Sequence, residues 1–187
     1  MILLASRSPR RRELLDQIGV QHEVMPVEVD ETPLAGEAAE AYVRRVTLAK
    51  ARRARELRPD LPVLAADTAV VLDDRPLGKP RDEEHAVEML LALSGRTHQV
   101  LSGVALVTGK GIAYRLSTSE VTFDTLSEAQ ARRYWETGEP ADKAGGYAVQ
   151  GRAALFIRRI AGSYSGIMGL PLYETGQLLA EATLLDV

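Results

Sequence analysis

The sequence predicts an α/β fold with a mixed, twisted sheet and flanking helices, in a single domain that spans residues 1–187. Apolar runs of strand length alternate with segments of helical periodicity early in the chain, which is typical of parallel strands joined by helices. Two long strand-like segments flank Gly109, Lys110 and Gly111 and predict an antiparallel hairpin. The chain has 187 residues, of which 45% are hydrophobic, so it can bury a substantial core.

Strands are expected where apolar or β-branched residues run for several positions between turn residues. These segments are residues 1–5, 22–29, 63–72, 100–107, 112–123 and 154–160. Along 112–123 the apolar positions are even-numbered up to Leu116 and odd-numbered at Val121 and Phe123. A one-residue phase change moves side chains to the opposite face of a sheet, so we expect a bulge or break near residues 117–120.

Helices are expected where apolar residues recur every three or four positions. In the first, Ser8 is a typical N-cap, Pro9 suits the first helical position and Gly19 ends the helix. The others are expected over residues 37–58, 82–93, 127–137 and 171–185. The many arginines of the helix over 37–58 are expected to be solvated. One face of that helix is expected to contain Tyr42, Val46, Ala49 and Arg53.

The bulk composition argues against several classes of protein. Net charge is −3 and aromatic residues are 5%, which disfavours a nucleic-acid-binding protein that uses the arginines of residues 44–58. The absence of cysteine excludes disulfides, thiolate metal sites and a cysteine nucleophile. The chain has no signal-peptide pattern and no apolar run of the roughly 18 residues that a membrane span requires. We therefore expect a cytoplasmic protein that binds neither nucleic acid nor membrane.

The N-terminal strand runs straight into a turn that is rich in hydroxyl and guanidinium groups. Ser6 and Ser8 are followed by Arg10 and Arg11 at the start of the first helix. The free amide groups and positive dipole end of a helix attract anions, and arginine adds planar, bidentate recognition of phosphate. The turn is therefore a candidate polyphosphate site. The alternative is an ordinary solvated basic helix start.

Asp67 interrupts a strand that is otherwise apolar on both sides. An unpaired carboxylate there would be costly, so the group is expected to be paired, to bind a metal or to take up a proton. The alternative to a functional role is a structural ion pair with one of the arginines. Thr68 can make hydrogen bonds from the opposite face of the same strand.

Two further segments carry candidate phosphate ligands. Lys79 lies on a turn between Gly78 and Pro80, and a lysine held there suits phosphate as a point charge. Lys143 belongs to the loop over residues 139–151, in which Gln150 could read the edge of a base. Either segment could also be an ordinary turn. Residues 162–171 are also glycine-rich but lack the spacing of a P-loop, so a structural turn, a dimer contact and a phosphate site all stay open.

The candidate metal ligands all offer oxygen atoms. They are Glu31, Asp67 and, as a third candidate, Asp142. Hard oxygen ligands suit Mg²⁺ or Mn²⁺. The three histidines show no zinc spacing and are expected to be structural or exposed.

Five motifs occur in a specific order along nearly the whole chain. They are LASRSPRR at 4–11, ADT at 66–68, GKP at 78–80, DKAGGY with QG at 142–147 and 150–151, and GSY with GLPL at 162–164 and 169–172. Together they resemble the Maf family of nucleoside triphosphate pyrophosphatases. The resemblance implies two lobes around a central cleft, as in the inosine triphosphate pyrophosphatases. It also implies a divalent metal and a homodimer.

The resemblance extends to a subgroup. One Maf subgroup acts on dTTP and UTP, whereas another prefers 7-methyl-GTP and carries Gln after the strand Asp and Glu before the late glycine. This chain has Thr68 and Gln150 at those positions and therefore resembles the dTTP/UTP type. The family's specificity positions fall on Arg11, Thr68 and Gln150, and its proposed general base falls on Asp67.

The hypothesis from the sequence is hydrolysis between the α and β phosphates. Asp67 would bind metal or accept a proton from water, and Glu31 would help to hold the metal. The triphosphate and its developing charge would be held by Ser6, Ser8, Arg10, Arg11, Lys79 and Lys143. The alternatives are a 7-methyl-GTP or non-standard purine substrate, and a non-catalytic nucleotide-binding regulator of cell division.

Overall fold

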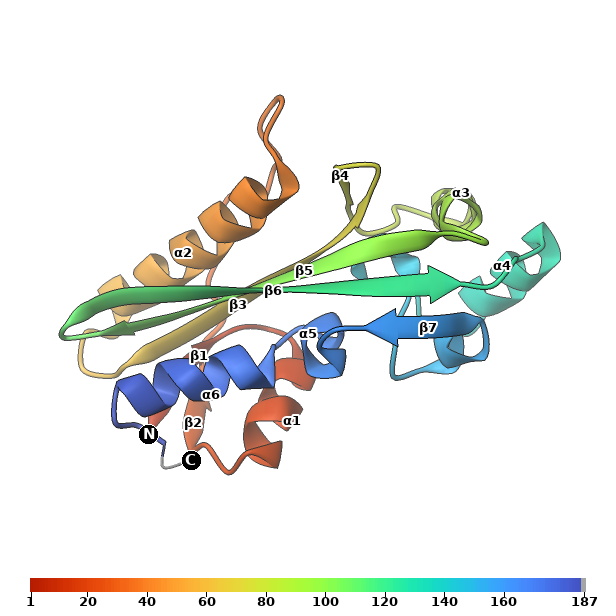
Figure 1. The fold of residues 1–187 in the computed structure, drawn as a ribbon. Helices are drawn as coiled ribbons and strands as arrows, with labels where there is room; N and C mark the ends of the chain where they lie inside the picture. Colours follow the sequence, from red (N-terminus) through yellow and green to blue (C-terminus); the bar gives the residue numbers. More distant parts are fainter. Residues whose placement is uncertain (186–187) are drawn as a thin grey trace.

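A seven-stranded mixed sheet runs the length of the molecule and carries helices on both faces (Figure 1). The computed structural model describes residues 1–185, so the last two residues of the predicted domain lie outside the described part. The path of the sheet is β2-β1-β3-β5-β6-β7, and β4 pairs with β3 off this path. Strands β2, β1 and β3 are parallel, and the other pairs are antiparallel. The predicted α/β fold with a mixed sheet is confirmed.

The strands are β1 (Ile2–Ala5), β2 (His22–Val24), β3 (Val63–Leu72), β4 (Arg75–Leu77), β5 (Thr97–Thr108), β6 (Gly111–Phe123) and β7 (Ile157–Ala161). The helices are α1 (Pro9–Gln17), α2 (Ala39–Leu57), α3 (Glu83–Leu93), α4 (Glu128–Trp135), α5 (Tyr164–Met168) and α6 (Leu172–Glu181). Two 3₁₀ turns, η1 (Ala144–Gly146) and η2 (Arg152–Leu155), precede β7.

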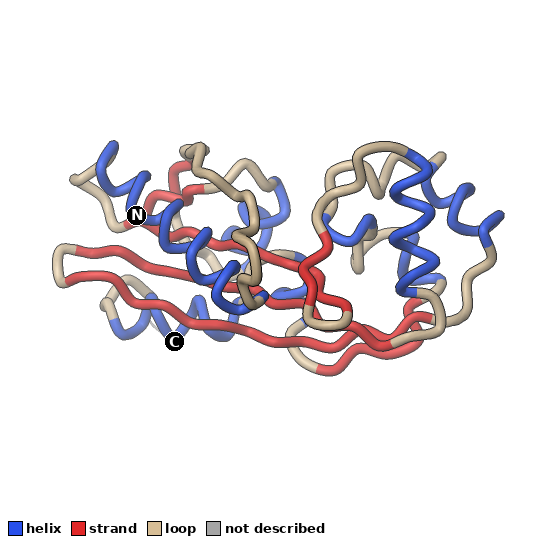
Figure 2. The backbone as a smooth tube through the Cα atoms, turned by 90° about the horizontal axis from the view of Figure 1, so that it is seen from above, coloured by secondary structure: helices blue, strands red, loops and turns tan. Residues whose placement is uncertain are grey.

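The two faces of β3 are covered differently. Its odd-numbered apolar residues pack against α2 along the whole strand. Its even-numbered residues pack on two successive groups of helices: Leu64 and Ala66 share a core with residues of α1 and α6, whereas Val70 and Leu72 share a core with residues of α3 and α4. Figure 2 shows these two groups of helices side by side along the sheet.

The edge of β3 that faces β1 is open over four residues. Strand β1 pairs with Val63–Ala65 and β4 pairs with Val70–Leu72. Residues 66–69 therefore have no strand beside them on this edge, directly beyond the carboxyl end of β1. This is where open α/β sheets usually bind ligands.

The predicted bulge near residues 117–120 is wrong. Strands β5 and β6 pair without interruption from Thr97 opposite Thr122 to Thr108 opposite Gly111, and the shift occurs at Thr122 and Phe123 in the pairing with β7. The parity change has another cause. Strand β6 packs its even side on α2 only as far as Leu116, whereas its odd side meets the α3–α4 core at Val121.

Several boundaries also differ from expectation. Strand β2 ends at Val24, β7 begins only after the turn η2, and α6 ends at Glu181. Strand β4 and helix α5 were not predicted. The helix predicted over residues 127–137 is observed as α4, and Ser127 begins it with a full capping box with Gln130. Ser8 occupies the N-cap position of α1, but its side chain makes no capping hydrogen bond within residues 1–185.

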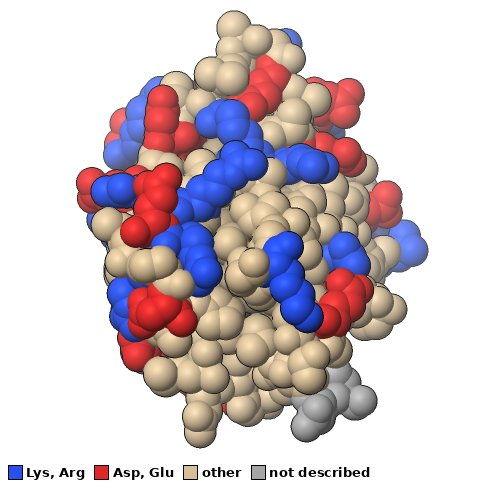
Figure 3. All heavy atoms as spheres, turned by 90° about the vertical axis from the view of Figure 1, so that its left-hand side faces the viewer, with Lys and Arg blue, Asp and Glu red and all other residues tan. Residues whose placement is uncertain are grey.

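Except for Val46, the residues predicted to share one face of α2 are not the residues that the structure buries. The buried residues are Ala39, Val43, Val46, Thr47, Lys50, Ala51 and Ala54, whereas Arg53 is exposed. Small residues on this stripe let the helix lie close to the sheet. On the face shown in Figure 3, Lys and Arg side chains are interspersed with Asp and Glu. Across residues 1–185, no helix is both long enough and apolar enough to cross a bilayer.

Candidate active site

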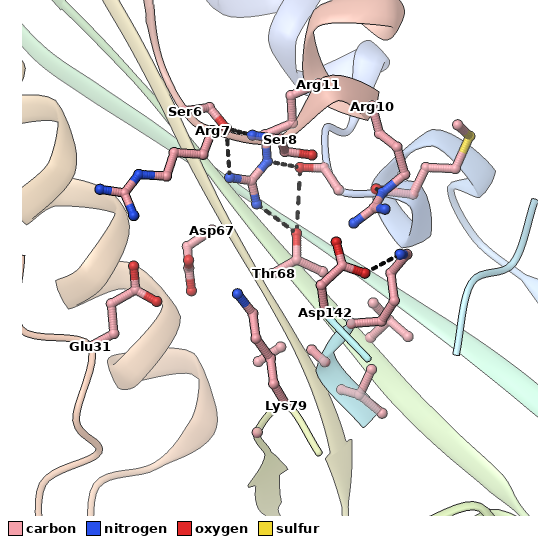
Figure 4. Close-up of a pocket in the computed structure, with 18 of the residues that line it drawn as sticks. Ser6, Arg7, Ser8, Arg10, Arg11, Glu31, Asp67, Thr68, Lys79 and Asp142 are labelled. Atoms are coloured by element: carbon pink, nitrogen blue, oxygen red, sulfur yellow. Dashed lines mark hydrogen bonds and ion pairs between the residues drawn. The ribbon is translucent and has the colours of Figure 1, made fainter. Parts of the chain in front are cut away.

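A cavity of about 780 Å³ opens at the uncovered edge of β3, between the two groups of helices. It is lined by every residue that the sequence marked as a candidate site residue: Ser6, Ser8, Arg10, Arg11, Glu31, Asp67, Thr68, Lys79, Lys143 and Gln150. Figure 4 shows the serines and arginines of the N-terminal turn on one side and Lys79 pointing in from the opposite side. Six cationic side chains and four carboxylates line the cavity, in a chain whose net charge is −3.

The turn from β1 to α1 forms one wall. The Ser8 amide donates to the Ser6 hydroxyl at 3.1 Å, which fixes the turn before Pro9 begins the helix. Because α1 starts at the cavity, its first amide groups and its positive dipole end lie at this wall. The wall suits an anion.

Arg11 is held rigidly at the back of this wall. Its Nε donates to the Gly169 carbonyl at 2.7 Å, and its terminal nitrogens lie 3.4 Å from the hydroxyls of Ser6 and Thr68. Burial lowers the pKa of Arg11 below its ordinary value, and the nearby Asp67 carboxylate opposes that shift. The arginine therefore joins α1, β3 and the glycine-rich segment in one cluster.

The glycine-rich segment over residues 162–171 belongs to the site. The carbonyl of Met168 accepts from Arg10 Nε at 3.4 Å, as that of Gly169 accepts from Arg11. Gly169 has φ 124°, a conformation that side chains disfavour. The sequence left three roles open for this segment: a structural turn, a dimer contact or a part of the phosphate site. The geometry supports the third role.

Asp67 is paired as expected, but its partner is a lysine that was not among the predicted site residues. Its side chain is only 10% exposed, and Lys50 Nζ donates to Asp67 Oδ1 at 2.8 Å. The same ammonium lies 2.8 Å from Glu31 Oε1, so the two carboxylates converge on one point. A signal existed, because Lys50 lies on the stripe Val43–Val46–Lys50–Ala54, where a lysine interrupts small and apolar residues.

Arg45 holds the segment that carries Glu31. Residues 25–38 contain no regular helix or strand. The Arg45 guanidinium bridges this segment by donating to both carboxylate oxygens of Glu37, at 2.7 and 2.8 Å, and to the carbonyls of Asp30 and Thr32. The hydrogen bonds from Arg45 lower the pKa of Glu37 to about 2. Glu31 lies between the two anchored carbonyls.

The carboxylate pair fits a Mg²⁺ or Mn²⁺ ion. Mg²⁺ is usually bound by one or two carboxylates together with substrate phosphates and water. Glu31 and Asp67 supply two such oxygens around the point that the Lys50 ammonium now occupies. Within residues 1–185, no group of three or more His, Cys, Asp or Glu residues could hold a metal by itself. Asp142 instead pairs with Lys143.

Two loops bring Lys79 and Lys143 to the same cavity. The Gly145 amide donates to the Gly78 carbonyl at 3.0 Å, which ties the two loops together. Gly145 has φ 69°, and a Cβ there would lie 2.9 Å from Val70 atoms, so the contact requires glycine.

A comparison with protein families finds a match over nearly the whole chain. Residues 1–182 match the family described as "Maf-like protein".

The chain belongs to the Maf family.

Its Maf relatives include three proteins named dTTP/UTP pyrophosphatase. The relative from Alkalilimnicola ehrlichii is 58% identical over 96% of this chain and 92% of its own length. The relative from Methylococcus capsulatus is 56% identical over 95% of this chain and 89% of its own length. The relative from Xanthomonas euvesicatoria is 54% identical over 96% of this chain and 97% of its own length.

Proposed function

We propose that this Maf protein hydrolyses dTTP and UTP to the nucleoside monophosphate and pyrophosphate. The observation that carries the proposal is the convergence of Arg11, Thr68 and Gln150 on a cavity that also contains the Glu31 and Asp67 carboxylates and several cations. Relatives at 54–58% identity that bear the name dTTP/UTP pyrophosphatase support the same activity.

The triphosphate lies along the cationic walls. Arg10, Arg11 and the amide groups at the start of α1 hold it on one side, and Lys79 and Lys143 hold it on the other. The hydroxyls of Ser6 and Ser8 add hydrogen bonds. Fixed cations aimed at developing charge are usually the largest single catalytic contribution, and here they stabilise the departing pyrophosphate.

The carboxylates act at the α phosphorus. Water attacks this atom, the bond from the α phosphorus to the bridging oxygen breaks, and pyrophosphate leaves with the bonding electrons. Asp67 accepts the proton of the attacking water. A divalent metal held by Asp67 and Glu31 would neutralise phosphate charge when bound.

Gln150 and Thr68 select the base. Uracil and thymine present a donor at N3 and an acceptor at O4, which match the carbonyl and amino groups of a glutamine amide. Cytosine presents the reverse pattern. A carboxylate at position 150 would only accept, and so would suit a guanine edge with two donors.

Two further points belong to the same proposal. The protein acts as a homodimer, as the Maf resemblance implies. It works in the cytoplasm, which the absence of cysteine supports.

The test is pyrophosphate release from a panel of nucleoside triphosphates, with and without Mg²⁺ or Mn²⁺. Metal-dependent release that favours dTTP and UTP is the expected result. A preference for 7-methyl-GTP would overturn the roles of Thr68 and Gln150. Binding without release from any nucleotide would favour the regulator of cell division instead.

A further inference from the structure

The loop that carries Gln150 is anchored by residues outside the cavity. Gln150 itself is exposed, in a turn closed by the hydrogen bond from the Gly151 amide to the Ala148 carbonyl at 3.0 Å. An amide side chain can discriminate between bases only if its backbone stays in one place. The anchors lie on α4 and just after it, at the end of the sheet far from the β5–β6 turn (Figure 1).

The first anchor is the phenol of Tyr134. This side chain is buried, and its ring packs edge-on against Phe156 with centroids 5.2 Å apart. Its hydroxyl accepts from the Ala148 amide at 3.1 Å and donates to Glu139 Oε1 at 2.5 Å. The phenol therefore holds the loop on the N-terminal side of Gln150.

The second anchor is the Glu139 carboxylate. It accepts from the amides of Arg152 at 2.9 Å and Ala153 at 3.4 Å, on the C-terminal side of Gln150. It also packs directly on Gly151, where a Cβ would come within 2.2–2.4 Å of the carboxylate atoms. A side chain at position 151 would therefore collide with the Glu139 carboxylate in its present position.

We propose that Tyr134 and Glu139 are positioning residues for base selection. They form a clamp that holds residues 148–153 from both sides of Gln150, and neither lines the cavity among residues 1–185. The proposal rests on the base-reading role of Gln150 in the proposed function. The phosphate-binding arginines and Asp67 are held by other contacts, so the clamp governs which base is accepted more than how fast phosphate is cleaved.

The test compares kcat/KM for UTP and CTP, which carry the same sugar and phosphates. Tyr134→Phe keeps the ring and removes both hydrogen bonds. We expect the preference for UTP over CTP to fall roughly tenfold, which corresponds to about 1.4 kcal/mol of discrimination. The fall in kcat/KM for UTP should come mainly from a higher KM. A lower folded fraction would slow both substrates equally and leave the ratio unchanged.

Tyr114→Phe is the matched control. Tyr114 is a half-buried tyrosine whose hydroxyl has no hydrogen-bond partner among residues 1–185, and it packs on the α2 side of the sheet. Its removal should leave the UTP to CTP ratio unchanged.

Glu139 supplies a second, independent variant should Tyr134→Phe fold poorly. Glu139→Ala should lower the ratio at least as much as Tyr134→Phe. Glu139→Gln keeps the shape and one acceptor, and should restore part of the preference.

Combination with Gln150→Ala decides the outcome. If the clamp acts through Gln150, then Gln150→Ala with Tyr134→Phe should be no less selective than Gln150→Ala alone. Additive losses, or an unchanged ratio in both clamp variants, would overturn the clamp and leave the proposed function standing. An unchanged ratio in Gln150→Ala would remove both the base reader and its clamp. Absence of UTP hydrolysis by the unaltered protein would refute the proposed function and this inference with it.

Discussion

Replacing Asp67 with asparagine separates the chemical role of this carboxylate from its role as a counterion. The side chains of Asp67 and Lys50 are 10% and 11% exposed, and their ion pair is 2.8 Å long. Breaking a buried pair from one side typically costs about 3–5 kcal/mol. Here Lys50 keeps Glu31 at 2.8 Å, and the asparagine oxygen can still accept a hydrogen bond.

We therefore expect a smaller loss of about 2 kcal/mol in the free energy of unfolding, close to the value of a hydrogen bond to a charged group. For a chain of this length that corresponds to a fall in Tm of roughly 4–8 °C. Loss of a general base should lower kcat for UTP by roughly 10²–10⁴ at a temperature well below Tm. The measurements are thermal unfolding by circular dichroism and pyrophosphate release.

The double variant Lys50→Met/Asp67→Asn also removes the ammonium that has lost one of its two carboxylate partners. Its stability should return to within about 1 kcal/mol of the unaltered protein, because removing both charges of a buried pair costs far less than removing one. Its activity should stay lost. Recovery of turnover in the double variant would show that Asp67 serves only to neutralise Lys50. A single variant that keeps more than about a tenth of kcat would likewise refute the general-base role, which predicts at least a hundredfold loss.

Three further perturbations test the segment of Glu31, the base-reading position and His98, a buried residue of β5 outside the cavity lining. Arg45→Ala releases the segment of Glu31, so half-saturation by Mn²⁺ should need roughly 10–100-fold more metal, whereas Arg53→Ala, which breaks only an exposed pair on the same helix, should not change it. Gln150→Glu should lose the preference for dTTP and UTP and gain activity on 7-methyl-GTP; an unchanged substrate profile would contradict the assignment. Burial lowers the pKa of His98 from 6.5 to about 4. As the pH drops from 6.5 to 4, the unfolded chain is protonated at His98 before the folded chain is, so the free energy of unfolding falls. That fall should reach roughly 3 kcal/mol and should be shallower in His98→Gln, as measured by urea unfolding at each pH; equal slopes would exclude His98 as its source.

Features that depend on neighbouring residues were predicted well from the sequence, whereas contacts between residues far apart in the chain were not. The strand over residues 63–72 was predicted to the residue, because its apolar run and its boundaries are local properties. The ten candidate site residues were identified from residue types at motif positions, and the structure brings all ten to one cavity. Their chemical roles stay predictions until the variants are measured.

The failures share one cause. The parity change in residues 112–123 predicted a bulge because periodicity cannot tell a shifted strand from a straight strand with two successive partners. The face of the helix over residues 37–58 was misplaced because Lys50 counts as polar in any periodicity analysis, although its head group finds Asp67 17 residues later.

The sequence by itself determined most of the strands and helices and the ten candidate residues that line the cavity, because residue types, spacing and motif order are properties of the sequence alone. Only the tertiary structure decided the partner of Asp67, the role of the glycine-rich segment and the anchors of the Glu31 and Gln150 loops. Each of these depends on contacts between residues far apart in the chain, such as Arg11 with Gly169 and Arg45 with Asp30. Apart from Lys50, whose place on the buried stripe of α2 was a signal, such contacts leave no mark on the spacing of residues along the sequence, because the fold of the intervening backbone brings the residues together.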